Sequence, residues 1–115
     1  MKKAVLFAFN GEPVCFIHVL LNALDMNGKG CEVRVVIEGA ATGLVPEMIR
    51  EGSPLFGLFQ KARAQGLIDG ACRACSAKMG ATRAVEEAGL AFLDDMSGHP
   101  SMSGYIDRGY EIITF

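Results

Sequence analysis

The segment Lys3–Phe9 is apolar after its first residue and is closed by the turn-forming pair Asn10-Gly11. A run without polar alternation is typical of a strand buried on both faces of a parallel sheet. Pro13 suits the first turn of a following helix, which Gly28 is expected to end. Its apolar positions recur at helical spacing at Phe16, Ile17, Leu20, Leu21 and Leu24. The chain therefore begins with a strand and a helix that packs on it.

The remaining sequence repeats this alternation. Strands are predicted at Glu32–Glu38, Leu67–Ala71, Leu90–Leu93 and Tyr110–Phe115, and helices at Thr42–Arg50, Ser53–Gln65, Ser76–Glu87 and Ser101–Arg108. Gly66 is a candidate C-cap for the third helical segment. Nothing in the composition divides the chain, so residues 1–115 are expected to form one domain. We predict an α/β fold: a three-layer sandwich with a mostly parallel five-stranded sheet and helices on both faces.

The charge is nearly balanced, with 11 Lys and Arg against 13 Asp and Glu, and no basic run is longer than Lys2-Lys3. Phosphate backbones and anionic membranes attract basic patches, so we expect no nucleic-acid and no membrane partner. The mean hydropathy of +0.28 is high for a small soluble monomer. Self-association into a homo-oligomer is therefore expected.

The apolar run behind the first lysines ends after six residues, at Phe9. A secretory core needs about seven to fifteen apolar residues and a membrane span about twenty. We therefore expect a cytoplasmic protein. In that compartment its cysteines are expected to bind metal, take part in redox chemistry or pack as apolar groups rather than form structural disulfides. They are Cys15, Cys31, Cys72 and Cys75.

Ligands of open parallel sheets bind outside the carboxyl ends of the strands. The loops expected there are residues 10–13, 39–43, 72–76 and 95–100. Candidate substrate-binding residues in or next to these loops are Asn10, Gly11, Ser76, Lys78, Ser97 and Gly98.

Cys75 lies where the third strand turns into a helix, and unpaired backbone N–H groups at such a place stabilise a thiolate. Arg73 and Lys78 would act in the same direction. We therefore predict Cys75 as a nucleophile or sulfur carrier, with the structural alternative that it packs as a small apolar residue. Cys72 is a candidate partner that resolves a disulfide or persulfide on Cys75. His99 is the candidate for proton transfer.

Two other interpretations remain open. Cys15 and His18 share a helical face and, with Cys72 and Cys75, have the composition of a zinc site. Alternatively, the cysteines are incidental and the loops form a small-molecule binding module. The first hypothesis, sulfur handling by Cys75, requires no cofactor.

The chain resembles the DsrE/DsrF-like family of small sulfur-relay proteins over nearly its full length. The likeness rests on the opening strand, the Asn10-Gly11 turn into a long helix, and the segment Ala74-Cys75-Ser76 with Gly80 shortly after. The resemblance implies an α/β fold with a mainly parallel sheet and assembly as trimers or hexamers. It also implies that Cys75 carries sulfur as a persulfide between donor and acceptor proteins, as a sulfurtransferase-type carrier for which no independent turnover is implied.

Overall fold

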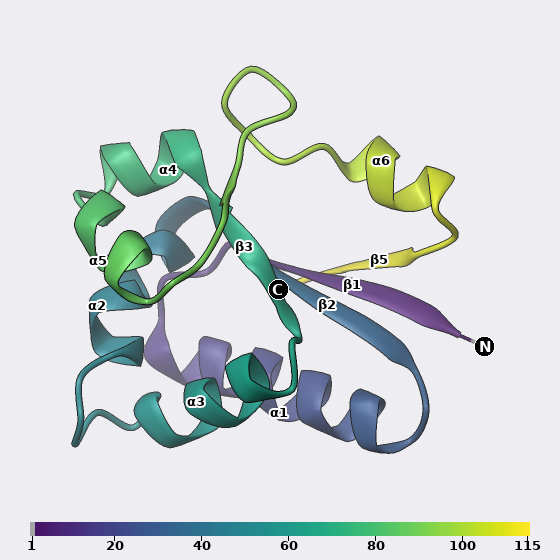
Figure 1. Ribbon diagram of the computed structural model, residues 1–115, viewed down its shortest axis with the longest axis horizontal. Helices are drawn as coiled ribbons and strands as arrows, with labels where there is room; N and C mark the ends of the chain where they lie inside the picture. Colours follow the sequence, from purple (N-terminus) through teal and green to yellow (C-terminus); the bar gives the residue numbers. More distant parts are fainter. Residues whose placement is uncertain (1) are drawn as a thin grey trace.

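The apolar runs form one five-stranded sheet in the computed structural model, which describes residues 2–115 (Figure 1). The strands are β1 (Lys3–Ala8), β2 (Glu32–Ile37), β3 (Ile68–Cys72), β4 (Phe92–Leu93) and β5 (Glu111–Thr114). Their order is β4-β3-β2-β1-β5, and every neighbouring pair is parallel. The predicted α/β fold is confirmed, and the sheet is parallel throughout rather than mostly parallel.

Helices make each crossover between strands. They are α1 (Pro13–Gly28), the 3-10 helix η1 (Gly39–Leu44), α2 (Val45–Met48), α3 (Phe56–Ala64), α4 (Arg73–Lys78), α5 (Thr82–Glu87) and α6 (Met102–Asp107). As predicted, Pro13 opens α1 and Gly66, with φ +72°, follows the end of α3.

Two apolar clusters cover opposite faces of the sheet. The larger contains Phe16 of α1, Phe59 of α3 and Val85 of α5, whereas the smaller packs Tyr105 of α6 against Phe7 of β1. Figure 1 shows α1 and α3 on one side of the strands and α6 on the other. The molecule therefore has the three layers that the sequence predicts, with most helices on one face.

Some helix boundaries differ from the prediction. The helix expected over residues 76–87 is two helices, α4 and α5, because Gly80 takes φ +69° between them. α4 begins at Arg73, before the predicted start, so that Cys75 lies inside its first turn. The helix expected from Thr42 is preceded and partly replaced by η1, which starts at Gly39.

None of the helices within residues 2–115 combines the length and the apolar character that a bilayer crossing requires.

Candidate functional site

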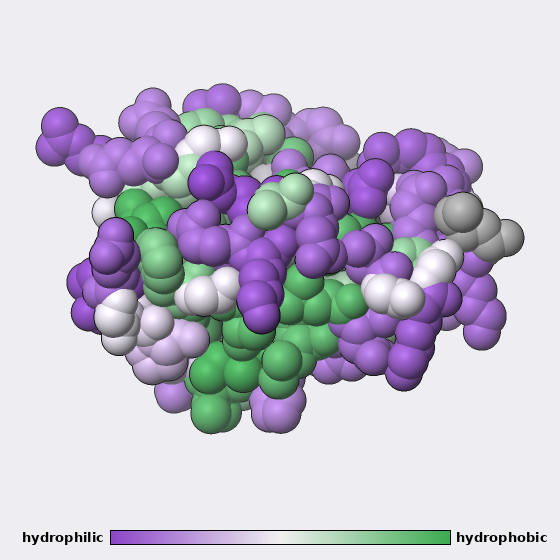
Figure 2. All heavy atoms as spheres, turned by 60° about the horizontal axis from the view of Figure 1, so that its bottom comes forward, coloured by the Kyte–Doolittle hydropathy of each residue, from purple (hydrophilic) through white to green (hydrophobic). Residues whose placement is uncertain are grey.

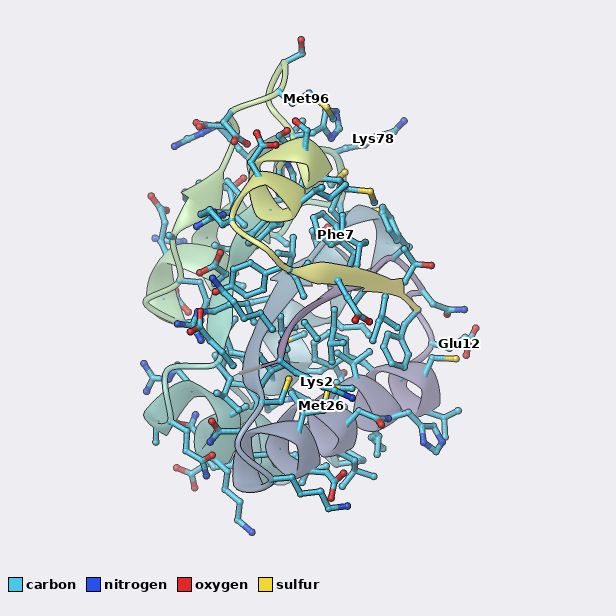
Figure 3. The ribbon with its side chains drawn as sticks, turned by 90° about the vertical axis from the view of Figure 1, so that its right-hand side faces the viewer. Lys2, Phe7, Glu12, Met26, Lys78 and Met96 are labelled. Carbon is cyan, nitrogen blue, oxygen red and sulfur yellow. The ribbon has the colours of Figure 1, made fainter. Side chains whose placement is uncertain are left out.

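The connections that follow β3 and β4 leave toward opposite faces of the sheet. The crossover after β3 passes through α4 and α5 on the face of the larger apolar cluster, and the crossover after β4 passes through α6 on the opposite face. Adjacent parallel strands whose connections leave in opposite directions open a gap at their carboxyl ends, where ligands commonly bind. Figure 3 shows Met96, which follows β4, and Lys78 of α4 at this end of the molecule, opposite Lys2 and Met26.

Cys72 and Cys75 lie where β3 passes directly into α4. Cys72 is the N-cap of α4, and its Sγ accepts a hydrogen bond from the backbone N–H of Cys75 at 3.4 Å. Cys72 is fully buried, whereas Cys75 is partly exposed. The two thiols therefore have different access to solvent although they share one turn of chain.

A tight hairpin carries His99 to the cysteines. Met96 and His99 exchange both backbone hydrogen bonds, and the two residues between them, Ser97 and Gly98, have φ of +50° and +88°. Positive φ at both central positions is the signature of a type I′ turn. The backbone N–H of Ala74 donates to the Gly98 carbonyl at 2.9 Å, so the turn is attached to the start of α4.

The imidazole of His99 meets both thiols. Its Nδ1 lies 3.1 Å from Sγ of Cys72 and 3.8 Å from Sγ of Cys75. The Cys72 thiol is also 3.7 Å from the Gly98 carbonyl oxygen. Since the His99 side chain is 40% exposed, it connects the buried thiol to the surface.

Glu38 completes the cluster from the carboxyl end of β2. Its residue exposure is only 7%, and its Oε1 lies 3.5 Å from Nδ1 of His99 and 3.7 Å from Sγ of Cys75. One ligand atom each from Glu38, Cys72, Cys75 and His99 falls within 4.8 Å of the others. Two thiols, an imidazole and a carboxylate at this spacing are suited to thiol chemistry or to metal binding.

Burial controls the protonation of Cys72. It raises the pKa of the Cys72 thiol to about 12, with the neighbouring Cys75 thiol and the Glu38 charge acting in the same direction. The hydrogen bond from the Cys75 backbone N–H opposes this shift but is the weaker effect. Cys72 is therefore a neutral thiol near neutral pH when no cation is bound.

Thr42 holds the loop after β2 against α4. Its hydroxyl lies 2.8 Å from the Gly39 carbonyl oxygen and 3.2 Å from the Cys75 carbonyl oxygen, and the side chain is fully buried. One hydroxyl proton serves one acceptor at a time, but both acceptors lie within reach. This contact fixes the distance between the Glu38 loop and the Cys75 helix.

A cavity of about 280 Å³ opens beside Cys75. It is lined by Gly39, Ala40, Cys75, Lys78 and Met79. Gly11 packs against one of its walls, because a Cβ there would stand 3.0 Å from the Cβ of Ala40. The loop after β1 thus supports the cavity without lining it.

Only some of the residues predicted to bind substrate lie where a ligand could reach them. Lys78 lines the cavity, whereas the Asn10 side chain accepts from the Glu12 backbone N–H and shapes the turn into α1. Ser76 is fully buried, which removes it from any surface that a ligand reaches. Ser97 and Gly98 form the hairpin turn, and Gly98 contributes its carbonyl oxygen rather than an open surface.

The zinc set proposed from the sequence needs correction. Among residues 2–115, the group of metal-ligating side chains that converges with Cys72 and Cys75 contains Glu38 and His99, and neither Cys15 nor His18 belongs to it. Cys15 and His18 lie on α1, where His18 is exposed. Arg73 likewise differs from expectation, because its guanidinium pairs with Asp94 at 2.7 Å.

Sequence reasoning missed Glu38 and Thr42 as site residues. The signal for Glu38 was its position: it is an acidic residue directly after a buried strand and directly before Gly39, at the sheet edge where ligands bind. Thr42 carried no comparable signal, because its role depends on a contact with a residue 33 positions away.

No protein-family model matches the sequence. The chain is 31% identical over 97 residues to the uncharacterized protein MJ0733 of Methanocaldococcus jannaschii, across 84% of this chain and 77% of that protein. It is also 38% identical over 52 residues to an uncharacterized protein of Archaeoglobus fulgidus, across 45% of this chain and 84% of that protein.

Among solved structures, the conserved protein of unknown function BT1422 from Bacteroides thetaiotaomicron superposes with a TM-score of 0.66. The superposition covers 99% of this chain and 94% of that protein, and at 15% identity it shows a shared fold alone. The sequence match with the methanogen protein is long enough to show descent, and the chain belongs to the family of MJ0733.

Proposed function

We propose that this protein handles sulfane sulfur, with Cys75 as the sulfur-accepting thiolate, in the manner of the DsrE/DsrF-like proteins that it resembles. The observation that carries the proposal is the difference between the two thiols. Cys75 lines a cavity of about 280 Å³, whereas Cys72 is fully buried. A thiol that accepts sulfur from outside needs such open space in front of its Sγ.

The acceptance step conserves electrons overall. The Cys75 thiolate attacks the outer sulfur of a persulfide donor, one S–S bond forms as the donor's S–S bond breaks, and the donor leaves as a thiolate. Delivery is the same step in reverse order: an acceptor thiolate attacks the outer sulfur on Cys75, and Cys75 departs as a thiolate. Neither step needs a cofactor.

Two neighbours are placed to take the Cys75 proton. Oε1 of Glu38 lies 3.7 Å from Sγ of Cys75, and Nδ1 of His99 lies 3.8 Å from it. Both are base candidates, because catalytic hydrogen bonds are often this long in the absence of substrate. Lys78, exposed at the cavity, suits donors that carry a negative charge.

Cys72 has a supporting role in this cycle. Its pKa of about 12 keeps it protonated near neutral pH, so it is a poor nucleophile for discharging a persulfide. Its Sγ instead accepts the Cys75 backbone N–H and holds the first turn of α4. This assignment replaces the discharge by an intramolecular disulfide that the sequence suggests.

The same proposal includes a cytoplasmic location, protein donors and acceptors of sulfur, and a trimer or hexamer. Exposed apolar side chains on α1 support self-association: Val14 is 65% exposed and Leu21 is 46% exposed. In Figure 2 the bottom of Figure 1, where α1 runs, is turned toward the viewer. An apolar area covers the lower part of this face. Light scattering after gel filtration measures the number of chains directly.

The test of sulfur handling is mass spectrometry of reduced, metal-free protein after incubation with a low-molecular-weight persulfide. We expect one added sulfur atom, located on the Cys75 peptide after alkylation without reductant. Cys75→Ser should abolish the adduct. Cys15→Ser is the matched control, because Cys15 is also partly exposed but lies on α1, and it should retain the adduct. Equal loss in both variants, or an adduct only on other cysteines, would overturn the proposal.

A further inference from the structure

We infer that Glu38, Cys72, Cys75 and His99 form a binding site for one thiophilic divalent cation, with zinc as the best match. The inference concerns the same thiols as sulfur transfer but does not require that sulfur transfer occurs. It rests on the spacing of the four ligand atoms, on their chemistry, and on the contacts that hold them in place.

Three of the ligand–ligand distances are close to those of tetrahedral zinc, and all of them are below 4.8 Å. With Zn–S bonds of about 2.3 Å and Zn–N and Zn–O bonds of about 2.0–2.1 Å, a tetrahedral ion separates sulfur from nitrogen or oxygen by roughly 3.6 Å and nitrogen from oxygen by roughly 3.3 Å. The corresponding distances are 3.8 Å from Cys75 to His99, 3.7 Å from Cys75 to Glu38 and 3.5 Å from His99 to Glu38. The 3.1 Å between Cys72 and His99 must lengthen by about half an ångström.

The ligand set selects the cation. Two thiolates and an imidazole favour zinc or another thiophilic ion over magnesium or calcium, which prefer oxygen ligands. Two thiolates, one carboxylate and a neutral imidazole carry three negative charges against the two positive charges of the cation. The loaded site therefore keeps a net charge of −1, the charge that Glu38 alone carries before binding. The two thiol protons released into solution carry away the two positive charges that the cation brings.

The ligands are held in place by contacts outside the set. The Cys75 backbone N–H already points at Sγ of Cys72, which is the hydrogen bond that a metal-bound thiolate accepts. The Ala74–Gly98 backbone bond positions the His99 hairpin, and Thr42 holds the Glu38 loop against α4. The three segments that carry the ligands are therefore already held together, and cation binding needs to restrict few additional backbone or side-chain conformations.

Access and closure are both present. Cys72 and Glu38 are buried, whereas the His99 side chain is 40% exposed and Cys75 lines a cavity, so the cation arrives from that side. Four protein ligands fill a tetrahedral zinc ion, which is typical of closed sites. A cation bound in this way would occupy the Cys75 sulfur and exclude sulfur uptake there.

The test is zinc binding to the intact, reduced protein after chelator treatment and desalting, measured by native mass spectrometry and by competition with a chromophoric chelator. We expect one zinc per chain. Cys72→Ser and Cys75→Ser should lose it, and Glu38→Gln and His99→Asn should weaken binding by at least about tenfold, the loss that even an outer ligand contact commonly causes. Serine is itself a good N-cap, so Cys72→Ser should keep α4 folded.

Matched controls come from the other cysteine and histidine of the same molecule. Cys15→Ser and His18→Asn should bind zinc as tightly as the natural chain, because both lie on α1 outside the cluster. Cobalt gives a second signal: four-coordinate cobalt with thiolate ligands absorbs intensely in the visible range, and Glu38→Gln should change that spectrum.

The outcomes separate this inference from sulfur handling. Cys72→Ser that loses zinc but still takes one sulfur on Cys75 would support both, because serine can replace Cys72 as the N-cap of α4. The metal site would be overturned if the natural chain binds no zinc, or if the double variant Cys72→Ser, Cys75→Ser still binds it. Neither result would affect the sulfur test. Zinc-loaded protein should take up no sulfur on Cys75, and uptake at the rate of metal-free protein would contradict the shared use of that thiol.

Discussion

The backbone N–H of Ala74 donates to the carbonyl oxygen of Gly98 at 2.9 Å, and this bond attaches the hairpin that carries His99 to the first turn of α4. Two residues that are 24 positions apart in the sequence are therefore in direct contact. The cluster depends on it, because His99 follows Gly98 directly and Cys75 follows Ala74 directly.

Gly98→Ala should weaken the site. Gly98 has φ +88°, and a Cβ there would lie 3.3 Å from the Cβ of Ala74. A left-handed conformation costs a side-chain-bearing residue about 1 kcal/mol, and the contact pushes the hairpin away from α4. We expect lower stability in urea unfolding together with weaker zinc binding.

Gly57→Ala is the control for that variant. Gly57 lies within α3, its φ is not positive, and a Cβ there meets nothing within 4 Å. Alanine favours a helix over glycine by about 1 kcal/mol, so this variant should be more stable and bind zinc unchanged. Equal zinc affinity in both glycine variants would show that the hairpin position does not depend on Gly98.

Alkylation should distinguish the two thiols of reduced, metal-free protein at pH 8. Because burial raises the pKa of Cys72 to about 12, its thiol is almost entirely un-ionised at that pH, and the residue is fully buried. Peptide mapping after iodoacetamide treatment should find Cys75 labelled and Cys72 unlabelled. Adding denaturant before the reagent should label both, and rapid labelling of Cys72 in the folded protein would contradict its burial.

Ser76→Ala should stabilise the protein. The Ser76 hydroxyl is fully buried and has no hydrogen-bond partner among residues 2–115. A buried hydroxyl without a partner costs about 1–3 kcal/mol, and alanine also has the higher helix propensity in α4. The free energy of unfolding should rise by about 1 kcal/mol with zinc binding unchanged. A loss of stability would mean that the hydroxyl has a partner in solution.

The sheet was predictable because its signal is local. Apart from Lys3, Glu32 and Arg34, β1 and β2 consist of apolar residues, and asparagine or glycine follows each strand within two positions. Burial on both faces of a parallel sheet requires such strands whatever the rest of the chain does. Two predicted elements were less accurate because their extent depends on contacts with other parts of the fold and not on the local sequence alone. β4 pairs over two residues only, and Gly80 divides a stretch that forms helix well on either side.

The candidate site was predictable only in part. Cys72, Cys75 and His99 were named because the carboxyl ends of parallel strands meet at one edge, and the structure places all three there. Glu38 was missed because a single acidic residue at a strand end more often faces solvent, and its 7% exposure follows from packing. The exclusion of Cys15 and His18 depends on how α1 packs in three dimensions, which spacing along the chain does not determine.

Gly70→Ala should disturb the edge of the sheet that carries the site. A Cβ on Gly70 would lie 2.5 Å from the Ala91 carbonyl oxygen and 2.9 Å from Cγ of Leu93, so β4 must move. Because β3 and β4 pair over two residues only, little holds β4 against that push. We expect a loss of roughly 2 kcal/mol or more in the free energy of unfolding. A variant as stable as the natural chain would show that β4 pairing contributes little.

Tyr110→Phe should destabilise the protein in a pH-dependent way. The hydrogen bond from the Tyr110 hydroxyl lowers the pKa of Glu32 below its ordinary value of 4.5, helped by the charges of Lys3 and Arg34 and opposed by burial. A lowered pKa in the folded state stabilises it above the unfolded pKa, and this contribution disappears as pH falls through the folded value. The stability difference between the two proteins should be constant from about pH 6 to 8 and shrink toward pH 3. In a Glu32→Gln background the effect of Tyr110→Phe should not change over that range, and a pH dependence that persists there would assign it to another group.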